Sequence, residues 1–338
     1  MTQLVLNRNE VFQTPAPGVL RAIRRFRVDH VQRYLDNYGR SILVPKLSRR
    51  FRVSPDRILL TYGEEDLFRT VVSTLRPGKD ALLTHDYHYS YLDQYLRPQR
   101  IALRTFRMRE TDNAFQFDIS DCLRKYRKTR PNVLLLASPS NPTGTSITAR
   151  DLRVILDHIG QRTLVMVDEV NWGFDPAYDE PGFHSLLRQF PNLLIARSFS
   201  KRYAMAGLRI GFALCGSGVR GLLRFQDRYL GVSRILEEAA VAALDAEAYY
   251  SRVSRAVMGD RAWFVRSVRT LGVQAFDSTA NFVLLRLPTR CIPFVQRVLR
   301  REPVLIAKFV RSGLLRVTVG SPPYTRRLVA LLRSSIHA

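Results

Sequence analysis

The chain has 338 residues, 46% of them hydrophobic, a length that suits one large domain and a smaller second one. No apolar run approaches the ~20 residues that a membrane-spanning helix needs, and Arg8 and Glu10 stand where a signal peptide would have its apolar core. The formal net charge is +24, but the basic residues are spread along the chain and mixed with 29 acidic ones. With no zinc-finger or basic-zipper pattern, we expect neither a membrane nor nucleic acid as partner.

The three cysteines are Cys122, Cys215 and Cys291, which lie far apart in the sequence. Their spacing matches neither a zinc site nor a C-x-x-C redox motif, so no metal is expected. We interpret them as reduced and mostly buried, which is typical of a cytoplasmic protein.

Short apolar runs alternate with helical patterns along the first two thirds of the chain. Strands are predicted at 57–61, 133–137, 164–167, 193–196 and 210–214, and helices at 65–75 and 149–159. An alanine-rich helix at 237–244 then precedes short strands around 280–285. This order predicts an α/β fold with a doubly wound, mostly parallel sheet.

Three of the predicted strands end in polar residues. The strand at 133–137 leads to Asn141 in S-P-S-N-P-T-G, the strand at 164–167 to Asp168, and the strand at 193–196 to Lys201. Ligands of open parallel sheets bind at the carboxyl ends of the strands. The three side chains are therefore predicted to meet in one binding site.

Lys201 is one of only six lysines among the 53 basic residues, and it ends the segment S-F-S-K. Lysine condenses with carbonyl cofactors such as pyridoxal 5'-phosphate (PLP), which arginine does not. Ser198 and Ser200 flank it, and Arg209 follows in A-G-L-R-I-G, so the segment has donors for a phosphate. Taken alone, such a segment is as often an ordinary polar loop.

Asp168 and Asn141 supply what the cofactor ring of such a site needs. A carboxylate against the pyridine nitrogen keeps it protonated, so that the ring accepts electrons from the substrate's α carbon. The Asn141 amide can donate to the phenolic oxygen, and Pro142 fixes the turn that carries it. An isolated N-P-T-G turn or acidic pair is usually structural, but here each follows its own strand in this order.

These motifs resemble the fold-type-I PLP-dependent aminotransferases, in the branch of the histidinol-phosphate aminotransferases. The resemblance runs from L-N-R-N-E at 6–10 to L-R-V-T-V-G at 315–320, almost the whole chain. It implies that Lys201 carries the Schiff base and moves the proton, with Asp168 on the pyridine nitrogen and Asn141 on the phenolic oxygen. It also implies phosphate ligands and a substrate clamp: Ser198, Ser200 and Arg209 for the phosphate, and Arg316 with Asn9 for the substrate.

Two further segments resemble family motifs. Tyr34, in R-Y-L-D, matches a tyrosine that reaches the cofactor phosphate of a neighbouring subunit, which implies a homodimer with shared sites. Gly63, Glu64 and Glu65 match the glycine turn and helix start that cradle the phosphate. Glu64 is an unexpected charge there, and we expect it to point outward, where a carboxylate stabilises a helix start.

Three positions depart from the family pattern. Asn171 replaces the tyrosine that bonds the phenolic oxygen, and its side chain is shorter and does not titrate like a phenol. The aromatic residue that stacks on the ring falls at His88, or at Tyr87 one position before. An arginine that binds the phosphorylated substrate is matched by Lys308, which lacks the planar fork of arginine.

The resemblance implies a large PLP-binding domain at 36–233 and a small domain built from 1–35 and 234–338. The expected activity is amino transfer between an amino acid or amino-alcohol phosphate and a 2-oxo acid. Other activities remain open: decarboxylation of the threonine-phosphate decarboxylase type, or another PLP reaction of amino-acid biosynthesis. An alternative from another class is a basic nucleic-acid-binding or scaffold protein on a catalytically silent PLP fold.

Overall fold

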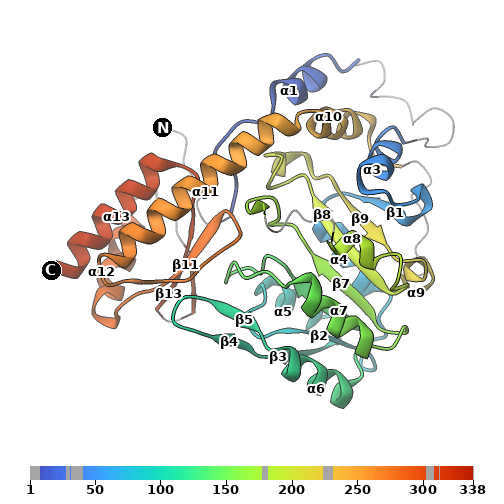
Figure 1. The fold of residues 1–338 in the computed structure, drawn as a ribbon, viewed down its shortest axis with the longest axis horizontal. Coiled ribbons are helices and arrows are strands. Elements are labelled where there is room, and N and C mark those ends of the chain that lie inside the picture. Colours follow the sequence, from blue (N-terminus) through green and yellow to red (C-terminus); the bar gives the residue numbers. More distant parts are fainter. Residues whose placement is uncertain are drawn as a thin grey trace.

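The computed structural model describes residues 8–27, 31, 41–176, 182–223, 231–301, 308–311 and 313–337. A large sheet with helices on both faces and a smaller sheet with helices on one side make up the molecule (Figure 1). No helix in the described ranges is both long and apolar enough to cross a membrane.

The large sheet has seven strands in the order β1-β9-β8-β7-β6-β2-β3. The strands are β1 (Ile58–Thr61), β2 (Ala81–His85), β3 (Ala102–Phe106), β6 (Val133–Ala137), β7 (Leu164–Asp168), β8 (Leu193–Ser198) and β9 (Gly211–Cys215). Strands β8, β7, β6, β2 and β3 run parallel, while β9 is antiparallel to both β8 and β1. The predicted strands and the mostly parallel, doubly wound sheet are confirmed, with strand ends displaced by at most two residues.

Both faces of the large sheet are covered. The covering helices are α3 (Leu43–Phe51), α4 (Glu64–Ser73), α5 (Tyr91–Leu96), α6 (Ile119–Thr129), α7 (Ala149–His158), α8 (Gly182–Leu186) and α9 (Val219–Leu223). Helix α1 (Pro17–Arg24) packs against α10 (Arg234–Asp245), and both contribute to the core on one of these faces. In β6, Leu134 and Leu136 face one core and Val133 and Leu135 face the other. A strand buried on both faces reads as a continuous apolar run, which is why these strands are visible in the sequence.

The smaller sheet is antiparallel, in the order β10-β11-β13-β12. Its elements are β10 (Gln274–Ala275), β11 (Phe282–Arg286), β12 (Lys308–Arg311) and β13 (Leu314–Thr318), with helices α11 (Glu247–Arg269), α12 (Ile292–Arg301) and α13 (Pro322–His337). A separate hairpin joins β4 (Met108–Glu110) to β5 (Phe115–Phe117). The long helix α11 runs from the large sheet to the small one, which has its own core with α13 (Figure 1).

Candidate active site

A cavity of about 670 Å³ opens at the carboxyl ends of β6, β7 and β8. It contains the predicted trio: Asn141 follows β6, Asp168 ends β7, and Lys201 follows β8. Arg316 enters the same cavity from β13 of the small sheet. The volume is that of a site for a cofactor and a small substrate.

Lys201 is partly buried, and its Nζ donates a hydrogen bond to the carbonyl oxygen of Arg8. Burial lowers the pKa of this amine to about 8; Glu10 opposes the shift and Arg316 adds to it. An amine with this pKa is partly neutral near pH 7.5, as a lysine nucleophile must be.

The region around Gly63 is built to hold an anion. Helix α4 begins at Glu64 with no side chain capping its first turn, so backbone N–H groups remain available there. The Arg209 guanidinium lies so close that a Cβ on Gly63 would be 2.6 Å from its Nη2, and Gly63 has a φ of +81°. Only glycine fits this position.

The two predicted serines complete this region. Ser200 is buried and accepts a hydrogen bond from Arg209 Nη1 at 3.4 Å, while Ser198 Oγ donates to Ser200 Oγ at 2.8 Å. The hydroxyls of Ser198 and Ser200, the Arg209 guanidinium and the start of α4 at Gly63 form a donor set that fits a phosphate. We call this set the anion cradle. Asp168 ends the neighbouring strand β7, and its carboxylate fits the nitrogen of a pyridine ring.

Arg316 is 3% exposed, and burial lowers the pKa of its guanidinium to about 10. Its Nη1 donates to Asn141 Oδ1, which joins the small sheet to the loop after β6. A buried arginine that faces an open cavity is suited to a carboxylate or phosphate, which its fork binds in two bonds.

The other predicted residues are distributed as follows. Asn9 is buried beside the cavity, where its Oδ1 accepts from Thr318 Oγ1 at 3.3 Å. His88 lines the cavity and is held by Asp93 at 2.8 Å, while Tyr87 packs against Phe115 and Arg311 instead. Asn171 is buried, and its amide donates to the carbonyl oxygen of Pro139 at 3.3 Å.

Glu65 also lines the cavity and is paired with Arg69 at 2.8 Å. Lys308 lies opposite Arg316 in the β12–β13 ladder, and its side chain is outside the described part of the structure. Tyr34 also falls outside the described residues.

The expectation that Glu64 points outward is wrong. Its side chain lines the cavity, as does that of Asp168, whose charge helps to raise the pKa of the Glu64 carboxyl. The residue directly follows Gly63, whose left-handed backbone conformation the local sequence pattern does not report.

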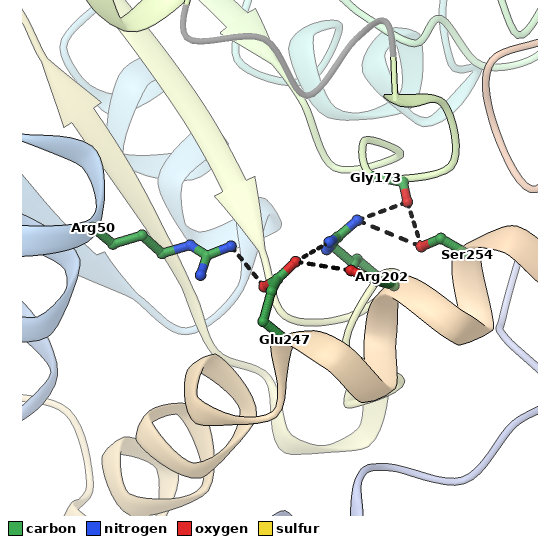
Figure 2. Close-up of polar contacts among 6 residues, drawn as sticks. Arg50, Gly173, Arg202, Glu247 and Ser254 are labelled. Carbon is green, nitrogen blue, oxygen red and sulfur yellow. Dashed lines mark hydrogen bonds and ion pairs between the residues drawn. The ribbon is translucent and has the colours of Figure 1, made fainter.

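Sequence reasoning missed the network that holds the loops after β7 and β8 together. Arg202, directly after Lys201, is 4% exposed and donates to the carbonyl oxygen of Gly173 at 2.8 Å and to Glu247 of α11 (Figure 2). Arg50 of α3 reaches the same Glu247 at 2.7 Å. Trp172 lies between two arginines, with its ring 4.9 Å from the Arg202 guanidinium and 3.9 Å from that of Arg197.

The cavity, the three residues Asn141, Asp168 and Lys201, and the phosphate-binding donors lie at the carboxyl ends of a mostly parallel sheet. This arrangement defines a PLP-dependent transferase of fold type I. The sequence matches the model of the family "Aminotransferase class I and II" over residues 2–332, and the chain belongs to that family. It is a PLP-dependent transaminase.

The similar proteins are named as follows. A histidinol-phosphate aminotransferase of Gluconacetobacter diazotrophicus is 30% identical over 341 residues, covering 98% of this chain and 91% of the relative. An aromatic amino acid aminotransferase of Streptomyces avermitilis is 30% identical, with 93% and 86% covered. The crystal structure of a histidinol-phosphate aminotransferase from Sinorhizobium meliloti with PLP has a TM-score of 0.86 and 25% identity, covering 99% of this chain and 91% of that one.

The lowered pKa of Lys201 gives a testable pH dependence. Its amine becomes neutral above a pH of about 8, not above 10.5 as an ordinary lysine does. The rate at which the apoprotein becomes covalently loaded with PLP should therefore rise toward pH 8 and level off soon after. Stopped-flow absorbance across pH 6 to about 10 measures this; a rate still climbing at the upper end would contradict it.

Proposed function

We propose that the cavity transfers an amino group from an amino acid or amino-alcohol phosphate to a 2-oxo acid, with histidinol phosphate as the first candidate. The observation that supports this is the position of Arg316, a buried fork from the small sheet facing Lys201 across one cavity. One similar protein is named for histidinol phosphate and another for aromatic amino acids, and these names support the two substrate classes that we propose to test.

Each residue of the trio has a proposed role. When bound, PLP supplies the electron sink for the bonds at the substrate's α carbon. Asp168 keeps the ring nitrogen protonated, Asn141 donates to the phenolic oxygen, and the Lys201 amine takes the α proton and returns it. Ser198, Ser200 and Arg209 hold the phosphate.

Asn171 and His88 complete the proposed contacts to the ring. Asn171 stands where the resemblance implies a tyrosine, and its amide donates to the Pro139 carbonyl. It can therefore give the phenolic oxygen at most its second N–H. His88, held by Asp93, is the residue that we propose to stack on the ring, because it lines the cavity and Tyr87 does not.

The assembly is also part of the proposal. We infer a homodimer in which Tyr34 of one protomer completes the site of the other. We also infer a cytoplasmic location, which the three free, buried cysteines support. The division into domains at 36–233 and at 1–35 with 234–338 belongs to the same proposal, and the smaller sheet, at 274–318, lies within the second of these.

Absorbance of the PLP-loaded protein tests the substrate proposal directly. Histidinol phosphate and a panel of amino acids are added one at a time, and conversion to the pyridoxamine form identifies an amino donor. Conversion by histidinol phosphate alone supports the proposal, and conversion by unphosphorylated aromatic amino acids moves the substrate to that class. Release of carbon dioxide with the cofactor left as aldehyde would identify a decarboxylase instead.

Replacing Arg316 tests whether this residue binds the substrate or only supports the structure of the site. Arg316→Lys keeps the charge but loses the fork, so KM for the donor should rise about tenfold with a smaller change in kcat. Arg316→Ala should lower kcat/KM roughly a hundredfold or more. Arg286→Lys, on neighbouring β11 with an exposed bond to Glu110, is the control and should leave both constants unchanged. Equal effects of the lysine variants at both positions would contradict the clamp.

A further inference from the structure

Glu64 is an acidic residue that lines the cavity and to which the proposed reaction gives no role. Its backbone lies in the anion cradle, next to Gly63 and the Arg209 guanidinium. Its side chain lines the same cavity as Asp168, and the two carboxyl groups interact electrostatically. The side chain thus begins where a phosphate would be held and extends into the cavity that would hold a pyridine ring beside Asp168.

A bound cofactor would use both of these places. In PLP the phosphate arm and the ring nitrogen are separated by two ring carbons, so Gly63 and Asp168 would hold the same edge of it. The Glu64 side chain occupies part of the cavity that these two residues border. A carboxyl held there and a cofactor bound there would compete for the same space.

The charged groups around Glu64 determine how strongly its carboxyl would oppose the binding of a phosphorylated cofactor. Burial raises the pKa of the Glu64 carboxyl well above its ordinary value, and Asp168 raises it further, while Lys201 and Arg209 oppose the shift. The remaining charged or titratable side chains that line the cavity are Glu65 on the same helix and, on other segments, Arg8, Glu10, His85, His88, Tyr89, Tyr91 and Arg316. Once ionised, Glu64 repels both Asp168 and a phosphate dianion.

We propose that Glu64 competes with PLP for its site and so sets how tightly the protein holds its cofactor. The inference rests on the proposed roles of Asp168 and Arg209. Neutral Glu64 can leave Asp168 at little electrostatic cost, whereas ionised Glu64 next to the phosphate weakens binding. The affinity for PLP is therefore lower than that of the same site without the Glu64 carboxylate, and the difference in affinity grows with pH.

The test compares dissociation constants of the apoproteins for PLP and for pyridoxal, which lacks the phosphate, by equilibrium dialysis. Glu64→Gln keeps the size and removes the charge, and should bind PLP at least about tenfold more tightly than wild type at pH 8. For pyridoxal the gain should be smaller. At pH 6 the ratio between variant and wild type should shrink, because wild-type Glu64 is then more protonated, and titration of the phosphate cancels in the ratio.

Two further variants make the result specific. Glu64→Ala removes size as well as charge and should tighten the binding of PLP and pyridoxal alike. Asp112→Asn, in the exposed loop between β4 and β5, makes the same change in net charge and should leave both constants unchanged. Circular dichroism of each variant shows that it is folded.

The outcomes separate this inference from the substrate proposal. Unchanged or weaker PLP binding in both Glu64→Gln and Glu64→Ala overturns the inference, even if wild type converts an amino donor. Tighter binding in both supports it, even if no member of the substrate panel reacts. An equal gain in Asp112→Asn would show an effect of net charge and would also overturn it.

Discussion

Lys201→Ala is expected to lower turnover of every amino donor by at least about 10⁴-fold, because Lys201 is the only lysine among the described residues that line the cavity. Steady-state kinetics with the best donor measures the loss. Borohydride reduction of wild type followed by peptide mass spectrometry should find the cofactor on Lys201, and no cofactor should be attached in the variant.

Lys46→Ala is the matched control, since Lys46 is bound to Asp245 outside the cavity. Its turnover and cofactor content should equal those of wild type. Turnover by Lys201→Ala within tenfold of wild type would contradict the role that we assign to Lys201.

Arg197→Met is expected to cause the largest loss of stability, about 3–5 kcal/mol. Arg197 and Glu169 are 4% and 1% exposed, and Arg197 Nε donates to Glu169 Oε2 at 2.6 Å. Removing the guanidinium leaves a buried carboxylate without its main counter-charge. Urea unfolding of the variant, loaded with PLP in the same way as wild type, measures the difference.

Two comparisons test this reasoning. Arg153→Met breaks an exposed ion pair with Asp157 at 3.8 Å and should cost less than about 1 kcal/mol. Adding Glu169→Leu to Arg197→Met also removes the buried carboxylate and should recover part of the lost free energy of unfolding. A loss of under 1 kcal/mol for Arg197→Met would mean that the pair contributes little.

The strands that carry the trio were predictable because they are buried on both faces, so that each is an unbroken apolar run with polar residues after it. Helix α4 was predicted from 65 to 75 and spans Glu64–Ser73, an error typical of helix ends, where the pattern is weakest. That Asn141 and Lys201 share a cavity then follows from the topology of a parallel sheet.

The resemblance implied that Asn9 and Arg316 share the site with Lys201, but the individual contacts between distant segments were not predictable from the sequence. Arg8 and Glu10 enter the cavity because Asn9 is bound by Thr318 and Asn281, far along the chain. The inward position of Glu64 was not predicted either: Gly63 beside it has a positive φ and lies against Arg209, which no local pattern reports. The domain boundary near residue 233 stays a prediction: α10, which begins at Arg234, packs against α1 and α3.

The position of Trp172 has a practical consequence for work in solution. The protein has two tryptophans, and Trp263 lies on α11, where Arg326 of α13 is its arginine neighbour. Trp172 directly follows Asn171, and its ring contacts the guanidinium of Arg202, the residue next to Lys201. Its fluorescence is therefore an intrinsic optical reporter of the two loops that carry Asn171 and Lys201, and replacing Trp263 with phenylalanine would isolate that signal without any label.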